Sequence, residues 1–135
     1  MPHNPTEAVN AFIDYAKAFE TLNPQAVVPY YHEPCMFISP QGVVVLTSQA
    51  HVGTFFAEVM EGLSARGYAR STFLNLQGKQ LSDILAVVSG VGVWLKADGD
   101  ELQRFGLTYT LRNTDGNWKI IVATVHDTET ALQLA

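Results

Sequence analysis

Two features of the sequence predict an α+β protein in which a cone-shaped, strongly curved antiparallel sheet wraps around an N-terminal helix. The last third of the chain, 83–127, has the pattern of three long strands joined by two tight turns. Segments with helical periodicity, the first helix and two further ones, come before it, and helices followed by strands are typical of this fold class. A strongly twisted sheet curls around its helices and leaves a pocket at its open end.

The N-terminal helix is predicted by its cap and by its apolar stripe. Asn4 and Pro5 suit the cap and the first helical position, where the missing N–H of proline costs nothing. Apolar side chains recur at steps of three and four residues as far as about Leu22, namely Ala8, Phe12, Tyr15, Ala16 and Phe19. Tyr15 belongs to this stripe, so its hydroxyl needs a buried partner. A short helix is expected over 25–31, kinked at its proline.

The middle of the chain is predicted to hold a hairpin, the third helix and one more strand. The segments 35–39 and 43–47 are short strand candidates on either side of a Pro-Gln-Gly turn. Ser48 is placed to cap a helix that has a clean apolar face and ends near Gly67. A further strand is expected over 71–76.

The C-terminal block carries the strongest strand signals. The segment 83–96 is rich in Val, Leu, Ile and Trp and contains no proline. An Asp-Gly turn leads to 105–112, where bulky apolar residues alternate with small or polar ones. The last strand, 118–125, is apolar on both faces, so each face needs a cover. The helices can cover one face, and a second copy of the sheet is the simplest cover for the other, which predicts a homodimer through the outer face of the sheet.

Composition limits the classes of function. The 135 residues, of which 47% are hydrophobic and 16% charged, fit one globular domain over 1–135. No apolar run is long enough to span a membrane and no signal peptide is recognisable, so a cytoplasmic protein without a membrane partner is expected. A net charge of −5 without a basic stripe argues against nucleic acid as a partner.

The sequence predicts no cofactor and no metal. It contains no glycine-rich phosphate loop, no His-Glu-x-x-His and no Gly-x-Ser-x-Gly motif. Four scattered histidines and one cysteine do not form a metal-binding pattern. The cysteine, Cys35, is expected to be a small core residue.

Several short motifs, in their order and spacing, resemble the nuclear transport factor 2-like superfamily. They are a first helix ending in Asn23, Tyr30-Tyr31 at the end of a short helix, the stretch 37–42, a Ser48-capped helix with Phe55-Phe56, and the closing stretch 115–120. The resemblance covers nearly the whole chain and implies a cone-shaped fold that hosts isomerases, dehydratases, polyketide cyclases and proteins that only bind small molecules. Because one such fold supports many functions, the resemblance implies no single activity.

Ketosteroid isomerase is the most informative relative in that superfamily. Tyr15 matches its oxyanion-binding tyrosine, whereas Ser39 falls where it has an aspartate base and Thr108 about where it has a second, protonated aspartate. The resemblance thus implies a carbonyl-polarising tyrosine without the rest of that catalytic set, which argues against isomerisation by the same mechanism.

Four residues are candidate catalytic groups. Tyr15 can donate a hydrogen bond to a ligand oxygen, or it can pack in the core and bond a strand. His126 and Asp127 end the last strand, and adjacent strand residues point to opposite faces, so at most one of them lines the pocket. Either can move a proton, and the plain alternative is a strand end in solvent. His51, in the first turn of the third helix, is a candidate base or a surface residue.

The pocket is predicted to be mostly aromatic, with candidate ligand-binding residues Phe19, Phe37, Ser39, Phe55, Tyr109 and Arg104. An arginine at the rim would select an anionic group, and a solvated surface position is its alternative. One hypothesis is a protein that binds a small apolar or mixed-polarity ligand. A second is a lyase or isomerase of the dehydratase or cyclase type, in which Tyr15 polarises a carbonyl and a His or Asp moves a proton. A third is a non-catalytic dimerisation module whose cavity is filled by side chains.

Overall fold

A computed structural model describes residues 6–128 of the chain. Its helices are α1 (Thr6–Phe19), α2 (Pro24–Val27) and α3 (Gln49–Ala65), with a 3-10 turn, η1 (Val28–Tyr30), after α2. Its strands are β1 (Tyr31–Ser39), β2 (Gly42–Leu46), β3 (Tyr68–Gln80), β4 (Leu85–Lys96), β5 (Glu101–Thr114) and β6 (Asn117–His126). This order is the predicted one, and the α+β fold class is confirmed.

The strands form one six-stranded sheet in the order β2-β1-β6-β5-β4-β3. Neighbouring strands are antiparallel with one exception, because β1 and β6 pair in parallel. The predicted antiparallel sheet is confirmed, and this one parallel pair is the detail that the sequence did not indicate. In the sheet, β1 of the β1–β2 hairpin lies beside β6, the last strand. Between them in the chain come β2, α3 and the strands β3, β4 and β5, and β6 then runs in the same direction as β1.

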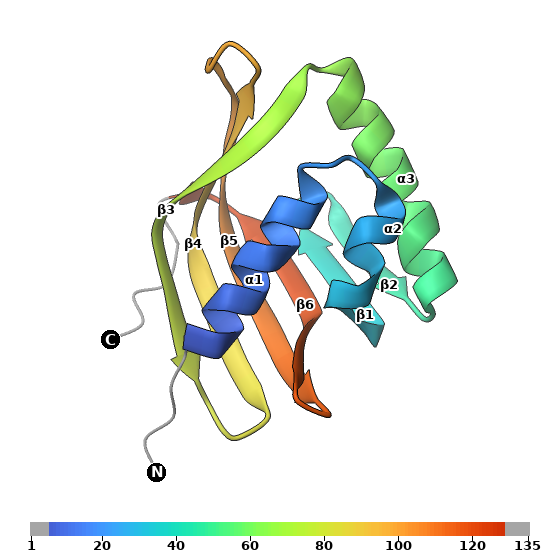
Figure 1. Cartoon of the computed structure of the whole chain (residues 1–135), viewed down its shortest axis with the longest axis vertical. Helices are drawn as coiled ribbons and strands as arrows, with labels where there is room; N and C mark the ends of the chain where they lie inside the picture. The colour runs from blue at the N-terminus through green and yellow to red at the C-terminus, as the bar shows by residue number, and fades with distance from the viewer. Residues whose placement is uncertain (1–5, 129–135) are drawn as a thin grey trace.

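The sheet bends around α1, which lies across its concave side, while α2 and α3 cover the end formed by β1 and β2 (Figure 1). Two interruptions of the ladder help the strands to curve. The register of β3 with β4 shifts between Leu74 and Gln77, where Asn75 has a positive φ of 54°, and the register of β5 with β6 shifts between Thr110 and Leu111. Such bulges bend a strand and increase its twist. The sheet therefore stays open and leaves room between itself and the helices.

The ends of the helices differ from the predicted ones by a few residues. Helix α1 ends at Phe19 and not near Leu22, because Leu22 has a positive φ of 55°, which no helix continues through. Asn23 then caps α2 by accepting a hydrogen bond from the Gln25 backbone N–H at 3.1 Å. Ser48 caps α3 as predicted, with 3.2 Å from its hydroxyl to the His51 backbone nitrogen. The predicted cap residue Asn4 lies outside the described residues.

The two faces of the sheet are distinguished by strand alternation. In β5, Leu107 and Tyr109 point to the inner face, which looks toward α1, and Thr108 between them points to the outer face. The core lies on the inner side, where Phe12, Phe56 and Leu107 are at most 2% exposed. None of the described helices is long and apolar enough to cross a membrane.

Candidate functional site

A cavity of about 540 Å³ lies between the inner face of the sheet and helices α1 and α3. This volume is within the range of about 300–1,000 Å³ that is usual for small-molecule sites. Six of the predicted site residues line it: Tyr15, Phe19, Phe37, Ser39, Phe55 and Tyr109. The open end of the cone thus holds a pocket, as the sequence predicted.

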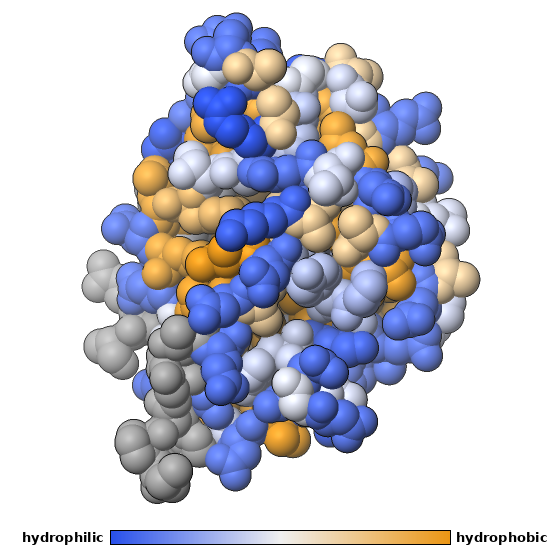
Figure 2. Space-filling model, viewed as in Figure 1, coloured by the Kyte–Doolittle hydropathy of each residue, from blue (hydrophilic) through white to orange (hydrophobic). Residues whose placement is uncertain are grey.

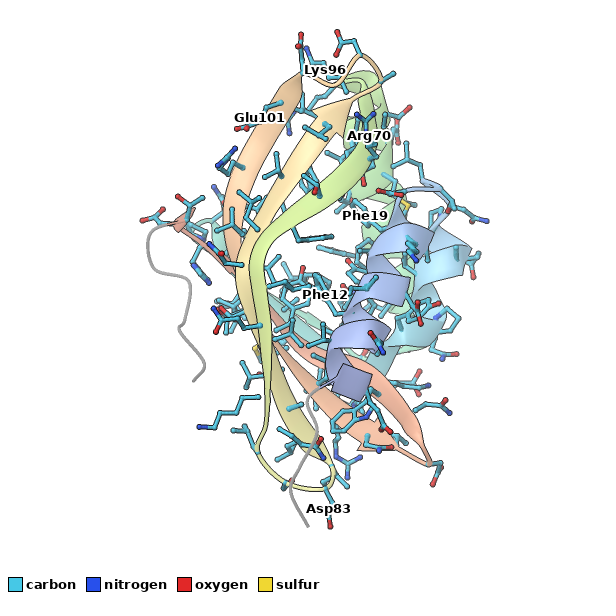
Figure 3. All side chains as sticks on the ribbon, turned by 60° about the vertical axis from the view of Figure 1, so that its left-hand side comes forward. Phe12, Phe19, Arg70, Asp83, Lys96 and Glu101 are labelled. Atoms are coloured by element: carbon cyan, nitrogen blue, oxygen red, sulfur yellow. The ribbon has the colours of Figure 1, made fainter. Side chains whose placement is uncertain are left out.

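Aromatic side chains make up most of the wall. Figure 3 shows Phe12 and Phe19 projecting from α1 toward the strands, one helical stripe facing the sheet. From the opposite side, β3, β4 and β5 contribute Phe73, Trp94 and Phe105. The ring of Phe12 meets those of Phe73 and Tyr109 edge to face, each at 5.2 Å between centroids. The cavity is therefore suited to a flat or compact apolar molecule.

Polar groups are few and unevenly placed in this wall. At the β1–β2 turn, Ser39 and Gln41 bond to each other, with 3.1 Å from the serine hydroxyl to the amide oxygen. Gln103 and Ser71 also line the cavity, and Tyr15 and Tyr109 reach it with their phenol groups. No Asp, Glu, Lys, Arg or His is among the described residues that line it. The polar chemistry of the wall is thus limited to hydroxyls and amides.

Tyr15 lies at the centre of an aromatic cluster and not at the surface. It is 6% exposed, and its ring packs edge to face against Tyr31 at 5.3 Å between centroids. Tyr109 approaches it from β5 at 6.4 Å. Because α1 presents Tyr15 from one side and the sheet presents Tyr31 and Tyr109 from the other, three phenol groups come together at the cavity wall, where Tyr15 and Tyr109 are lining residues and Tyr31 is not.

The hydroxyl of Tyr31 is a buried polar group without a satisfied hydrogen bond. It is fully enclosed, and although it faces Tyr15 closely enough to affect the pKa of that residue, no described group lies in hydrogen-bonding geometry with it. An unsatisfied buried hydroxyl destabilises a fold by about 1–3 kcal/mol. Such groups are uncommon in native proteins and call for a physical explanation.

Burial keeps all three phenols protonated. Burial is the largest cause that raises the pKa of Tyr15 and of Tyr31 well above the ordinary value, and each is raised further by the negative charge that a neighbouring phenolate would carry. Burial likewise raises the pKa of Tyr109 to about 12. At neutral pH these groups are therefore hydrogen-bond donors, suited to meet an oxygen acceptor of a ligand.

His126 lies on the outer face of the sheet and does not reach the cavity. Its Nε2 is 2.8 Å from the Thr108 hydroxyl, which in turn lies 2.9 Å from the hydroxyl of Ser89. A side chain at Gly106 would collide with the His126 ring, so this glycine makes room for the imidazole. The cavity is reached instead by Val125, the preceding residue of β6.

The other polar candidates are also outside the cavity. Asp127 follows β6 and is exposed, and its backbone oxygen lies 2.8 Å from Nδ1 of His126. His51 is exposed in the first turn of α3, 3.4 Å from the Thr47 backbone nitrogen. Arg104 is exposed and forms an ion pair with Glu101 at 2.7 Å. None of these groups is among the described residues that line the cavity.

Sequence reasoning missed several residues of the site, and a signal was present for one of them, Phe105. Phe105 continues the alternation of Leu107 and Tyr109 toward the inner face. Its ring lies across Gly92 of β4, where a Cβ would come within 2.6 Å of it. A glycine inside a strand marks such a close approach, so the Gly92 position indicated a large neighbour. No local signal pointed to the unsatisfied hydroxyl of Tyr31.

Metal and thiol chemistry find no support at this site. Within residues 6–128, no group of three or more His, Cys, Asp or Glu side chains is arranged to hold a metal ion. Cys35 is 3% exposed, and burial raises the pKa of its thiol to about 11. A protonated, enclosed thiol is a poor nucleophile, in agreement with a core role.

Solved structures share this fold at low sequence identity. An NTF2-like protein with a cystatin-like fold from Novosphingobium aromaticivorans is 12% identical, with a TM-score of 0.74 over 93% of this chain and 82% of that one. Aln2 from a Streptomyces species is 13% identical, with a TM-score of 0.74 over 92% and 90% of the two chains. An NTF2-like protein from Shewanella oneidensis is 18% identical, with a TM-score of 0.69 over 90% and 98%. These likenesses show the fold alone.

Sequence comparison gives the family. No curated protein is significantly similar to the chain. The family model described as NTF2-like protein (DUF6841) matches residues 6–128, which include every helix and strand described above. The chain therefore belongs to this NTF2-like family, DUF6841.

Proposed function

We propose that the protein binds a small molecule whose apolar, uncharged body fills the cavity and whose oxygen acceptor meets the phenol groups of Tyr15 and Tyr109. The observation that supports this most directly is the enclosed, unsatisfied hydroxyl of Tyr31 behind an aromatic cavity of about 540 Å³. Apolar walls with a few placed polar groups are the usual composition of such sites.

A ligand acceptor explains why an unsatisfied hydroxyl is tolerated. When Tyr15 donates its O–H to a ligand, its oxygen is left as an acceptor, and the neighbouring Tyr31 hydroxyl can then donate to it. A ligand acceptor would thereby orient the Tyr15 hydroxyl so that the unsatisfied Tyr31 hydroxyl gains a partner. A carbonyl or ether oxygen fits this role better than a carboxylate, because no described cation lines the cavity to balance a negative charge.

The reaction hypothesis has weaker support than binding. A lyase or isomerase of the dehydratase or cyclase type needs a proton-transfer group close to the carbonyl that Tyr15 polarises. His126, Asp127 and His51 all lie outside the cavity. The phenols are the one kind of ionisable group among the described lining residues, and their raised pKa makes them poor bases at neutral pH.

Two substitutions on neighbouring residues of β6 test the binding proposal. Val125 lines the cavity, whereas Thr124, the residue before it, points to the outer face opposite Thr108. The probe is N-phenyl-1-naphthylamine, an uncharged aromatic molecule that fluoresces in apolar surroundings. We expect it to bind the unaltered protein, to bind Val125→Phe at least about tenfold more weakly because the ring occupies the cavity, and to bind Thr124→Phe unchanged.

Two results contradict the proposal. One is the absence of binding to a folded, unaltered protein, and the other is equal weakening by both substitutions, which would place the probe elsewhere.

Trp94 supplies an independent signal because it lines the cavity, while Trp118 does not. Probe binding should therefore quench the fluorescence of Trp118→Phe, which retains Trp94, and leave that of Trp94→Phe nearly unchanged.

We also propose a homodimer through the outer face of the sheet. Apolar side chains remain half-buried there in the single chain, among them Val87 and Val91 of β4 and Val122 of β6. An apolar sheet face is usually covered by another surface. Sedimentation equilibrium tests this directly: Val87→Lys should shift a dimer to monomer, and a monomeric unaltered protein would exclude it.

A further inference from the structure

A second cavity opens beside the first, between α1 and β3. It measures about 390 Å³, and it shares Ala16, Ser71 and Phe73 with the wall of the main cavity. Figure 2 shows apolar surface on the side of the molecule where α1 faces β3. Unlike the main cavity, this side groove also has charged residues in its wall, Lys17 and Glu20. A groove with charged residues in its wall thus adjoins an apolar pocket.

The carboxylate of Glu20 is held in place at the point where the two cavities meet. Its Oε2 accepts a hydrogen bond of 2.8 Å from the backbone N–H of Ser71. The hydroxyl of Ser71 lies 2.7 Å from that of Tyr68, so one serine joins the carboxylate to a buried phenol. Burial raises the pKa of Tyr68 to about 12. The charge of Glu20 adds to this shift, and the hydrogen bond to Ser71 opposes it. An ordered negative charge therefore stands behind the shared wall.

Aromatic rings flank the same point. Trp94 of β4 lies directly opposite Ser71 in the register of the sheet and lines the main cavity. The ring of Phe19 stacks over Trp94 with an interplanar angle of 15° and 6.3 Å between centroids, and it meets Tyr68 at 5.6 Å. The faces of such rings attract cations. In the wall of the side groove itself, Phe73 lies with Glu20, and a carboxylate beside an aromatic ring is suited to bind an amine.

Two cations belong to this region, and neither forms an ion pair with Glu20 among the described residues. Lys17 lines the groove and is exposed. Arg70 is exposed and directs its guanidinium to the backbone oxygen of Lys96, at 3.5 Å. Lys17 is still close enough to the groove to oppose a second positive charge, which makes its removal informative.

From this arrangement we infer that the ligand carries a cationic amine on a short flexible arm, which passes between α1 and β3 and ends at Glu20. The inference rests on the proposed function, since the apolar body of the same ligand fills the main cavity. Oε2 of Glu20 is bonded to the backbone, and its other oxygen remains to accept a hydrogen bond from the ammonium group.

Glu20 also has a structural role as a hydrogen-bond acceptor for the edge strand, and the test must separate this role from binding of an amine. Because β3 is an edge strand, the Ser71 N–H points away from β4 and needs an acceptor outside the sheet. In Glu20→Gln the amide oxygen still accepts that hydrogen bond, so the edge stays satisfied while the charge is lost. Glu58→Gln is the matched control, because Glu58 is exposed on α3 and lines neither cavity.

Three fluorescent probes with one aromatic body serve as ligands. Dansylamide has no arm, dansylcadaverine carries an amine on a five-carbon arm, and dansyl-aminocaproic acid carries a carboxylate on an arm of similar length. We expect the amine probe to bind about tenfold more tightly than dansylamide, equivalent to ~1.4 kcal/mol. The gain should vanish in Glu20→Gln, persist in Glu58→Gln and increase in Lys17→Gln.

The outcomes distinguish this inference from the proposal beneath it. If dansylamide binds but the amine arm gives no gain over the carboxylate arm, the cavity proposal stands and the amine inference is overturned. The same holds if the gain persists in Glu20→Gln, because the arm then lies elsewhere. If no probe binds a folded protein, the proposed function fails and this inference fails with it.

Discussion

Around Thr108 and Val125, the inner and outer faces of β5 and β6 differ in chemistry, although they belong to the same strands. On the inner face, Leu107, Tyr109 and Val125 line a cavity that no charged side chain among the described residues enters. On the outer face, Thr108 and His126 continue a row of hydrogen bonds that begins at Ser89. Neighbouring residues of one strand therefore point to surroundings of different polarity: Val125 to the apolar cavity, and His126 to the hydrogen bonds of the outer face.

This difference shows why candidate catalytic residues cannot be taken from their neighbours in the sequence. His126 directly follows Val125, a lining residue, and for that reason it cannot line the same wall while the strand stays regular. Thr108 directly precedes Tyr109 and faces outward for the same reason. The three tests below ask whether the two faces are as separate in solution as in the structure.

High pH should have the largest effect, because it ionises the tyrosines, which are the ionisable side chains among the described residues that line the cavity. Burial raises the pKa of Tyr109 from an ordinary value of 10.0 to about 12. The folded state then holds this proton more tightly than the unfolded state, so its contribution to stability is complete below pH ~10 and is lost as the pH rises toward ~12. The free energy of unfolding should fall by ~1.4 kcal/mol per pH unit for each tyrosine that is protonated only in the folded state.

Urea unfolding at several values of pH between about 9 and 12 measures this slope. Tyr109→Phe is the control, since it removes one buried phenol and should make the decline shallower by about one tyrosine's share. An unchanged slope in that variant would mean that Tyr109 ionises as readily in the folded protein as in the unfolded chain.

Removing one hydroxyl from each of two tyrosines should have opposite effects on stability. In Tyr31→Phe an enclosed, unsatisfied group disappears, so the ligand-free protein should become more stable by about 1–2 kcal/mol. In Tyr68→Phe a hydroxyl that lies 2.7 Å from Ser71 is lost, and stability should fall by about 1 kcal/mol. Urea unfolding of both variants at neutral pH gives the comparison. Equal destabilisation would show that Tyr31 has a hydrogen-bond partner in solution.

The sequence predicted those parts of the fold that depend on local patterns. Alternation over 105–111 identified the strand and placed Tyr109 on its bulky face, and the helical stripe placed Tyr15 and Phe19 opposite it. Ser48 was predictable as a cap because its role involves only the first turn of the helix that it begins. In each case the deciding interactions lie within a few residues of each other.

The remaining features depend on contacts between distant segments. Glu20 and Ser71 are 51 positions apart, and their hydrogen bond exists because α1 crosses the edge strand there. Tyr31 is enclosed because it begins β1 opposite Ile120 of β6 and packs against Phe56 of α3. The parallel pairing of β1 with β6 likewise has no local signal. Periodicity gives the direction of a side chain within its element, whereas it does not give the neighbour that the element meets.

The smallest expected effect is a loss of stability when a hydrogen bond on the outer face is removed and the cavity is left unchanged. Thr108→Val keeps the shape of the side chain and removes the hydroxyl that joins Ser89 to His126. Stability should decrease by about 0.5–1.5 kcal/mol, the usual range for one hydrogen bond. Affinity for N-phenyl-1-naphthylamine should stay the same, measured by fluorescence titration beside Val125→Phe. The contrary result is that Thr108→Val weakens binding of the probe as strongly as Val125→Phe does. The hydrogen bonds on the outer face would then be coupled to the cavity, and His126 would again be a candidate to act on a bound ligand.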